Sequence, residues 1–197
     1  MMLNSLERAE LAPKQMIERL PTFMAKVTQL LDRLDVDLTS VQADHLAMRI
    51  NEQELAENAH KVWQEHGRVI SDAQINGRSI IVLEFNEPLI ASTWAVECLE
   101  LPYPAPGKIY PHQDWEHIEF VIPSNAETAE AYFADIKQKF PTLSQALERH
   151  PEIDVKLSSP KGDGERLNNP TVAFKHQGIC IKLHPHPLKA IVESEQG

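Results

Sequence analysis

The sequence predicts an α+β fold in which two βαβββ units form one curved mixed sheet, preceded by an N-terminal helical extension. The order strand, helix and three strands occurs twice along the chain. Each occurrence opens with a strand that carries a histidine, His45 and then His117, which are 72 residues apart in the numbering (45 to 117). The remaining N-terminal residues have helical periodicity and no later counterpart. The predicted segments are the extension (1–40), the first unit (41–104), a linker (105–114) and the second unit with a short C-terminal helix (115–197).

The extension is predicted to be a packing element without chemistry. Large apolar residues recur in it at intervals of three and four, as on the buried side of a helix. This stripe consists of Leu20, Phe23, Met24, Val27, Leu30, Leu31 and Leu34. Proline is tolerated in the first turn of a helix, where its missing N–H has no partner to lose. We therefore expect Pro21 to open the main helix, after a shorter helix over residues 13–20.

The first unit begins with a strand over residues 43–50, followed by a helix. Asn51 is predicted to cap this helix, with Glu54 three residues later completing a capping box. Gly67 is predicted to end it. Three strands follow, over residues 68–74, 78–85 and 94–101. The first two meet at Asn76-Gly77, a pair that tolerates the positive φ of a tight hairpin. The proline-rich segment after the last strand is typical of a linker, and its Tyr103 and Tyr110 are candidates to line a pocket.

The second unit repeats this order. Ser124 or Asn125 is predicted to cap a helix that runs to about Phe140, and an irregular segment follows. A long loop over residues 158–170 contains glycine and asparagine, and such loops are often functional. A hairpin turn is predicted at Gln177-Gly178. The predicted strands cover residues 115–122, 153–158, 171–176 and 178–184, and a short helix covers 188–195.

Ionisable side chains fall on one face of the predicted sheet, because alternate residues of a strand point to opposite faces. The side chains that this rule gathers are His45, Arg49, His117, Glu119, Lys182 and His184. The closing strand of the first unit is less clear, since Glu97 and Glu100 have opposite parity. We prefer Glu100, which lies at the strand end. A single histidine in a strand is more often structural than a ligand, but the combined pattern favours a metal site.

The predicted metal ligands are therefore His45, Glu100, His117 and His184. Three neutral imidazoles and one carboxylate leave a divalent ion with residual charge, which preserves its Lewis acidity. Zn, Ni, Mn and Fe all accept such ligands, so the residue types do not identify the ion. His186 remains an alternative to His184, because the intervening proline disturbs the strand.

Six stretches of the sequence resemble the YecM family of bacterial proteins, within the vicinal oxygen chelate superfamily of glyoxalase I, extradiol dioxygenases and bleomycin-resistance proteins. They are ADHLAMR (43–49), INGR (75–78), VECLELPYP (96–104), YPHQDWEHIE (110–119), SSPKGDGERLNNPT (158–171) and IKLHP (181–185). The resemblance implies a metal held in a curved sheet, with one ligand from the first strand and one from the last strand of each unit. It gives no reaction. Glyoxalase-like sites commonly have a carboxylate where this chain has His184, so their chemistry does not transfer directly.

Three further residues on the shared face are predicted to be catalytic. Glu119 is the candidate base, while Arg49 and Lys182 are candidates to hold a carboxylate or enolate oxygen. An internal salt-bridge network is the structural alternative for all three. We expect substrate to enter between the linker and the loop over residues 158–170, where Lys161 and Arg166 are further candidates to meet an anion.

The composition excludes several classes of protein. The chain has 197 residues, 42% of them hydrophobic and 24% charged, as in ordinary globular proteins. A net charge of −10 disfavours nucleic acid as a partner. The absence of a long apolar stretch and of a signal sequence predicts a cytoplasmic protein that does not cross a membrane. Cys98 and Cys180 are expected to be free, buried thiols.

Two functions follow from these predictions. The first is a metal-dependent enzyme, such as an isomerase, lyase or dioxygenase, acting on a small oxygen-rich, anionic molecule. The alternative is a non-catalytic protein of the same fold that sequesters a small ligand. A polar cavity with an open metal site would favour the enzyme. The charged character of the predicted site favours it too.

Overall fold

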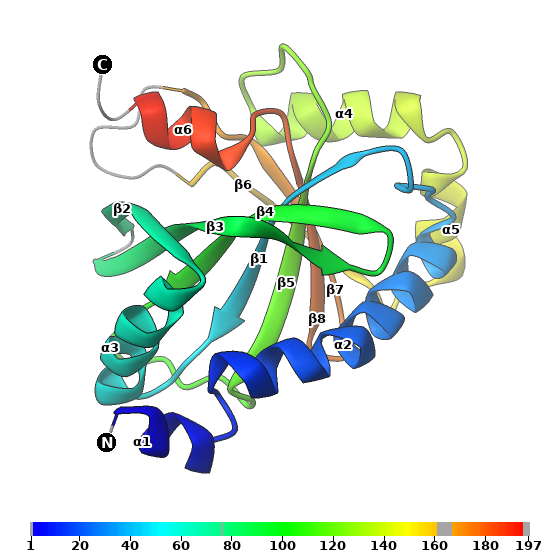
Figure 1. Cartoon of the computed structure of the whole chain (residues 1–197). Coiled ribbons are helices and arrows are strands. Elements are labelled where there is room, and N and C mark those ends of the chain that lie inside the picture. Colours follow the sequence, from blue (N-terminus) through cyan, green and yellow to red (C-terminus); the bar gives the residue numbers. More distant parts are fainter. Residues whose placement is uncertain (1, 76, 161–166, 195–197) are drawn as a thin grey trace.

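Eight strands form one curved, open sheet in the computed structural model, which describes residues 2–75, 77–160 and 167–194 (Figure 1). The strand order is β2-β3-β4-β1-β5-β8-β7-β6. The elements of the first unit are β1 (Gln42–Arg49), α3 (Gln53–Val62), β2 (Gly67–Ile75), β3 (Arg78–Ala91) and β4 (Trp94–Pro102). Those of the second are β5 (Asp114–Val121), α4 (Ala129–Lys139), α5 (Leu143–Arg149), β6 (Asp154–Ser158), β7 (Thr171–His176) and β8 (Ile179–His184). The predicted α+β class with two βαβββ units is confirmed.

The opening strands of the two units lie side by side in the middle of the sheet. β1 pairs antiparallel with β5, and each also pairs in parallel with the last strand of its own unit, β4 or β8. The four strands on which candidate ligands were predicted are therefore neighbours. This arrangement brings residues from both units to one place.

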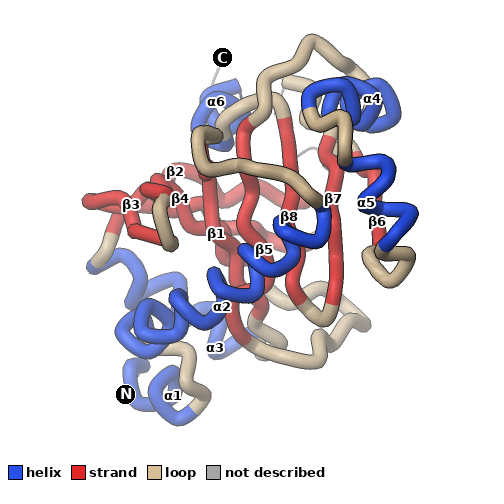
Figure 2. Tube along the Cα trace, turned by 90° about the vertical axis from the view of Figure 1, so that its right-hand side faces the viewer, coloured by secondary structure: helices blue, strands red, loops and turns tan. Residues whose placement is uncertain are grey.

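All the described helices except the C-terminal one cover one face of the sheet, and the main apolar core lies between these helices and the sheet. Two N-terminal helices, α1 (Met2–Arg8) and α2 (Pro13–Leu34), precede the sheet, and α2 packs across β5 and β8 (Figure 2). Its predicted apolar stripe is buried throughout. The C-terminal helix α6 (Leu188–Ser194) packs on the opposite face, hereafter the inner face, in a separate cluster with Val82 and Cys98.

Pro21 does not open a helix, contrary to the prediction. α2 begins at Pro13 and continues through Pro21. Pro13 occupies the first-turn position where proline loses no hydrogen bond. Pro21 lies on the exposed side, where water can hydrogen-bond the carbonyl group that loses its partner.

The predicted caps of two helices were also wrong. Asn51 does not cap α3, which begins after Glu52. The side chain of Asn51 instead accepts a hydrogen bond from the backbone N–H of Tyr110 and donates one to its carbonyl. α4 is capped by Thr128, whose hydroxyl accepts from the Ala131 N–H, and not by Ser124 or Asn125. In both cases a polar side chain was used for a tertiary contact or a turn, which the local pattern alone does not reveal.

Other boundaries differ in smaller ways. α3 ends at Val62, a 3₁₀ turn (Trp63–Glu65) follows, and Gly67 starts β2 instead of ending the helix. The segment predicted to be irregular contains α5. β3 is longer than expected. The turn at Gln177-Gly178 is confirmed, with φ values of 49° and 79°. Of the other predicted hairpin pair, Asn76 lies outside the described residues, and Gly77 has φ 80°.

Candidate metal centre

Two β-bulges shape the inner face where the units meet. Between Ala43 and His45, β1 has one extra residue, Asp44, relative to β5. Between Trp115 and His117, β5 has one extra residue, Glu116, relative to β1. An extra residue in one strand interrupts the alternation of side chains. As a result, each histidine shares the inner face with the carboxylate that precedes it.

Each of these carboxylates lies next to its histidine. Asp44 Oδ2 is 2.9 Å from His45 Nδ1, and Glu116 Oε1 is 3.0 Å from His117 Nδ1. A carboxylate that accepts from Nδ1–H fixes the tautomer and leaves Nε2 with its lone pair free. The repeated acid–histidine pair thus prepares His45 and His117 to offer Nε2 as a ligand.

Five side chains, hereafter the central cluster, meet where these nitrogens point: His45, Glu100, His117, Glu119 and His184. Glu119 is at its centre. One of its carboxylate oxygens lies 2.8 Å from His45 Nε2 and 3.8 Å from His117 Nε2, and the other lies 3.3 Å from His184 Nδ1. Glu100 approaches His45 Nε2 at 3.3 Å. The members of the cluster come from β1, β4, β5 and β8.

The chemistry of these donors fits a divalent metal ion. Within residues 2–75, 77–160 and 167–194, Nε2 of all three histidines is buried without an aligned hydrogen-bond partner. Buried polar atoms are normally satisfied, so three orphaned nitrogens around carboxylates point to a missing partner. Imidazole nitrogen and carboxylate oxygen suit Zn, Mn, Fe and Ni.

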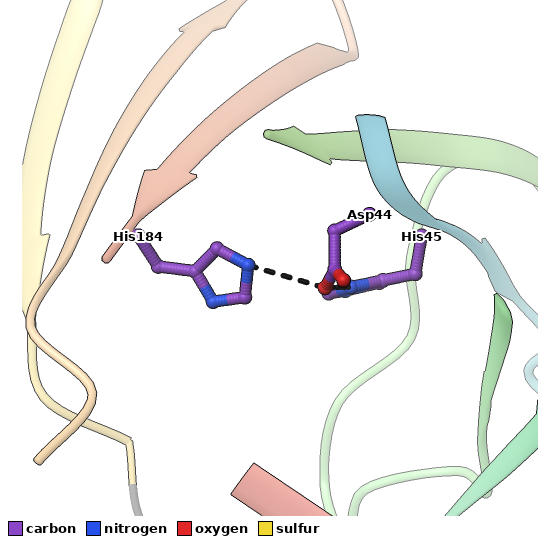
Figure 3. Close-up of side chains that lie close together, drawn as sticks. All are labelled: Asp44, His45 and His184. Atoms are coloured by element: carbon purple, nitrogen blue, oxygen red, sulfur yellow. Dashed lines mark hydrogen bonds and ion pairs between the residues drawn. The ribbon is translucent and has the colours of Figure 1, made fainter. Parts of the chain in front are cut away.

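Asp44 forms a second group with His45 and His184, shown in Figure 3. Its Oδ2 oxygen lies 2.9 Å from His45 Nδ1 and 3.2 Å from His184 Nε2. Both oxygens also accept from the single backbone N–H of Leu188 at 3.0 Å, at the start of α6. Asp44 is thus already in contact with two histidines and a backbone N–H. We therefore interpret Asp44 as a hydrogen-bond acceptor that orients histidines.

The charged groups beside the cluster are also arranged on the inner face. Arg49 makes a two-point ion pair with Glu116 and lies over the Tyr110 ring, with its guanidinium carbon 4.6 Å from the ring centroid. Lys182 is opposite Glu119 in the register of β5 and β8. Burial disfavours the charge of Lys182, but the carboxylates of Glu119, Glu100 and Glu116 outweigh it and raise its pKa.

The close packing of acidic and basic side chains in the central cluster shifts their pKa values. Burial opposes the ionisation of Glu100, but His45 outweighs burial and lowers the pKa of this carboxyl to about 2. The pKa of His45 is raised well above its usual value, since Glu119 and Asp44 outweigh the effect of burial. Burial and the charge of Lys182 lower the pKa of His117 to about 4. The carboxylates around His45 therefore favour its protonated form when no ion is bound.

A cavity of about 350 Å³ opens beside the cluster. It is lined by Tyr110, Pro111 and His112 of the linker, by residues of the β7–β8 hairpin, and by Glu116 and Cys180 on the inner face. Cys180 is opposite His117 in the register of β8 and β5. The cavity thus reaches the immediate neighbours of His117. It lies between the linker and the β7–β8 hairpin, and no described residue of the loop over 158–170, the other predicted border of the entry, lines it.

The predicted site residues are distributed as follows. All four predicted ligands lie in the central cluster, and Glu119 lies with them. Arg49 is outside it, bound to Glu116. His186 belongs to neither metal-capable group in the described part of the chain. Lys161 and Arg166 lie outside the described residues. Glu97 forms an ion pair with Lys189 of α6, away from the cluster.

Asp44 and Glu116 were missed by the sequence analysis. Strict alternation assigned them to the helix-covered face, and the bulges reverse that assignment. A signal was present, because Asp44-His45 and Glu116-His117 repeat an acid–histidine pair at the same separation as the two histidines.

The comparisons with known proteins identify the family. The family model described as YecM protein matches residues 12–195. The chain belongs to the YecM family. It is 38% identical to Protein YecM of Escherichia coli K12 over 177 residues, 90% of each chain. An uncharacterized protein of Haemophilus influenzae is 35% identical over 176 residues, which cover 86% of this chain and 88% of the relative.

A solved structure has the same fold as this member of the YecM family. The structural-genomics protein EC4020 matches with a TM-score of 0.80 and 35% sequence identity, over 95% of this chain and 93% of that one. The predicted resemblance to the family is therefore confirmed over nearly the whole length.

Two further expectations concern the cysteines and the membrane. Cys98 and Cys180 are both free and buried, as predicted. No helix in the described part of the chain has the length and apolar character needed to span a bilayer.

Proposed function

We propose that the central cluster binds one divalent metal ion and that the protein is a metal-dependent enzyme acting on a small, oxygen-rich, anionic molecule. The observation that carries this proposal is a set of three buried imidazole nitrogens without aligned partners. Nε2 of His45 and Nε2 of His117 lie beside Glu119, and Nε2 of His184 lies beside Asp44. His45, Glu100, His117 and His184 are the proposed ligands. A bound divalent ion would supply Lewis acidity toward two adjacent oxygens of a substrate.

The surrounding residues have separate proposed roles. Asp44 and Glu116 orient His45 and His117 through their Nδ1 atoms. Glu119 is the proposed base, because its carboxylate is buried at the centre of the cluster, among the proposed ligands. A carboxylate in this position could accept a proton from a carbon or hydroxyl group placed beside it.

Metal content tests the first part of the proposal. Protein purified without chelator and without a histidine tag is expected to contain close to one equivalent of a divalent ion per chain, by elemental analysis. Dialysis against a chelator should remove the ion and lower the midpoint of thermal unfolding, because a ligand that binds only the folded state stabilises it. Protein that binds none of Zn, Mn, Fe or Ni after reconstitution would contradict the proposal.

Turnover tests the second part. Metal-loaded protein should be screened against small hydroxy-keto acids and catechols, and Glu119→Gln assayed on any compound that is converted. General-base catalysis typically contributes about 10²- to 10⁴-fold, so this variant is expected to lose that much of kcat while keeping its metal. Full turnover with retained metal would assign the proton to another group. Loss of metal would make Glu119 a ligand.

Sequestration without turnover is the second candidate function. The aromatic side chains of Tyr110 and Trp115 in the cavity wall favour it, since such walls hold a ligand without reacting with it. Tight binding of a screened compound that is recovered unchanged from metal-loaded protein would support this alternative.

A further inference from the structure

Lys182 differs from the other charged side chains around the central cluster. Arg49 is paired with Glu116, Glu100 and Glu119 approach His45, and Asp44 accepts from His45 and Leu188. Lys182 is half-buried on the inner face, two residues before His184. In the described ranges, no hydrogen bond or ion pair joins its ammonium group to another residue.

An ammonium group in this position lacks acceptors. It has three N–H donors, and removing a charge from water without a partner is costly. Glu119, which is opposite Lys182 in the register of β5 and β8, already has both oxygens against histidines. An oxyanion supplied from outside would provide the missing acceptors.

A route to Lys182 exists on the same face. The cavity of about 350 Å³ includes Cys180 in its wall. Cys180 and Lys182 are alternate residues of β8, so their side chains lie on the same side of the sheet. A molecule that extends from the cavity past Cys180 along β8 would therefore lie on the face of the sheet that carries Lys182. The volume is sufficient for a ligand of several heavy atoms.

We propose that Lys182 binds an organic oxyanion of the substrate, a carboxylate or a phosphonate-type group, on a molecule whose two adjacent oxygens meet the central cluster. This inference rests on the proposed metal-dependent function and narrows its substrates to chelating organic acids. Lys182 would thus determine specificity, while the ion holds the chelating end.

Three hydroxamic acids that share one chelating group provide the test. Acetohydroxamate has an uncharged tail, the monohydroxamate of succinate ends in a carboxylate, and phosphonoacetohydroxamate ends in a phosphonate. Their affinities for Zn²⁺-loaded protein would be measured by calorimetry. The wild type is expected to prefer an anionic tail, and Lys182→Met to reduce that preference about 10- to 100-fold, as expected for a lost charge-assisted hydrogen bond.

Two variants make the result specific. Lys182→Arg keeps a cation and should restore part of the preference. Lys156→Met removes an equal charge from an exposed position on β6 and should leave the ratio of affinities unchanged. Thermal unfolding and zinc content would be measured for every variant, so that a folding defect is recognised. The wild-type affinity for each anionic chelator is divided by the affinity for acetohydroxamate. The larger of these two ratios shows whether a carboxylate or a phosphonate is preferred.

Four outcomes would overturn the inference. If Lys182→Met binds all three chelators as the wild type does, or if the wild type shows no preference for an anionic tail, Lys182 is not the anion site. If Lys182→Met weakens the binding of all three chelators equally, Lys182 only balances the charge of the cluster. If no chelator binds the zinc-loaded wild type, the proposed metal-dependent function fails as well, which separates this outcome from the first three.

Discussion

Replacing His117 by alanine is expected to remove most of the bound metal and, with it, the heat stability that the metal provides. His117 is fully buried and its Nδ1 lies 3.0 Å from Glu116, which fixes the direction of Nε2, and alanine would leave that position without a ligand atom. An ion present at a hundred times its dissociation constant stabilises a protein by about 2.7 kcal/mol. Addition of chelator should therefore lower the thermal stability of the wild type. It should hardly change that of His117→Ala, which binds little metal to begin with.

Metal content and the midpoint of thermal unfolding, each measured with and without chelator, check this prediction. His66→Ala is the control, because it removes an exposed histidine far from the inner face. It should behave as wild type. The metal hypothesis would be rejected if alanine variants of His45, Glu100, His117 and His184 all retained the metal content of the wild type.

Changing Asp44 to asparagine is expected to destabilise the metal-free protein by about 2 to 4 kcal/mol, the range for breaking a buried charged hydrogen-bond network. Asp44 is only 1% exposed and accepts from His45 and from the Leu188 N–H. An asparagine keeps the shape but has one oxygen acceptor in place of two. Its NH₂ group would then face another donor.

Urea unfolding of chelator-treated protein measures this effect as a change in the free energy of unfolding. Asp32→Asn, at an exposed position of α2, is the matched control and should change it by less than about 0.5 kcal/mol. An Asp44→Asn variant as stable as this control would show that Asp44 holds neither α6 nor the histidines in place.

The fold could be predicted largely from the sequence because its signals are periodic. Alternation in the opening strands and in the last strand was sufficient to place His45, His117 and His184 on one surface. The choice of Glu100 over Glu97 relied on its position at a strand end. These residues come close to one another only because the two units pair with each other. That pairing depends on contacts between distant parts of the chain, which no local sequence pattern reveals.

The details that were missed have a common physical origin. A bulge adds one residue without changing the composition of a strand, so Asp44 and Glu116 were assigned to the wrong face. Asn51 and Ser124 have the right chemistry for helix caps but are used elsewhere, Asn51 by Tyr110 and Ser124 by Asp135. In these cases tertiary hydrogen bonds override local preference.

The antiparallel pairing of β1 with β5 has a consequence for folding. The proposed ligands in the central cluster come from both sides of this junction, so neither half of the chain contains the complete set. In either half alone, the opening strand would be an edge strand with unpaired backbone N–H and C=O groups, and such strands readily pair with other chains. The parallel pairs β1–β4 and β5–β8 each join strands that are distant along the chain, and contacts of this kind form slowly. During synthesis the first half is therefore made with this sheet edge exposed, and the proposed metal site can form only after the second half has paired with it.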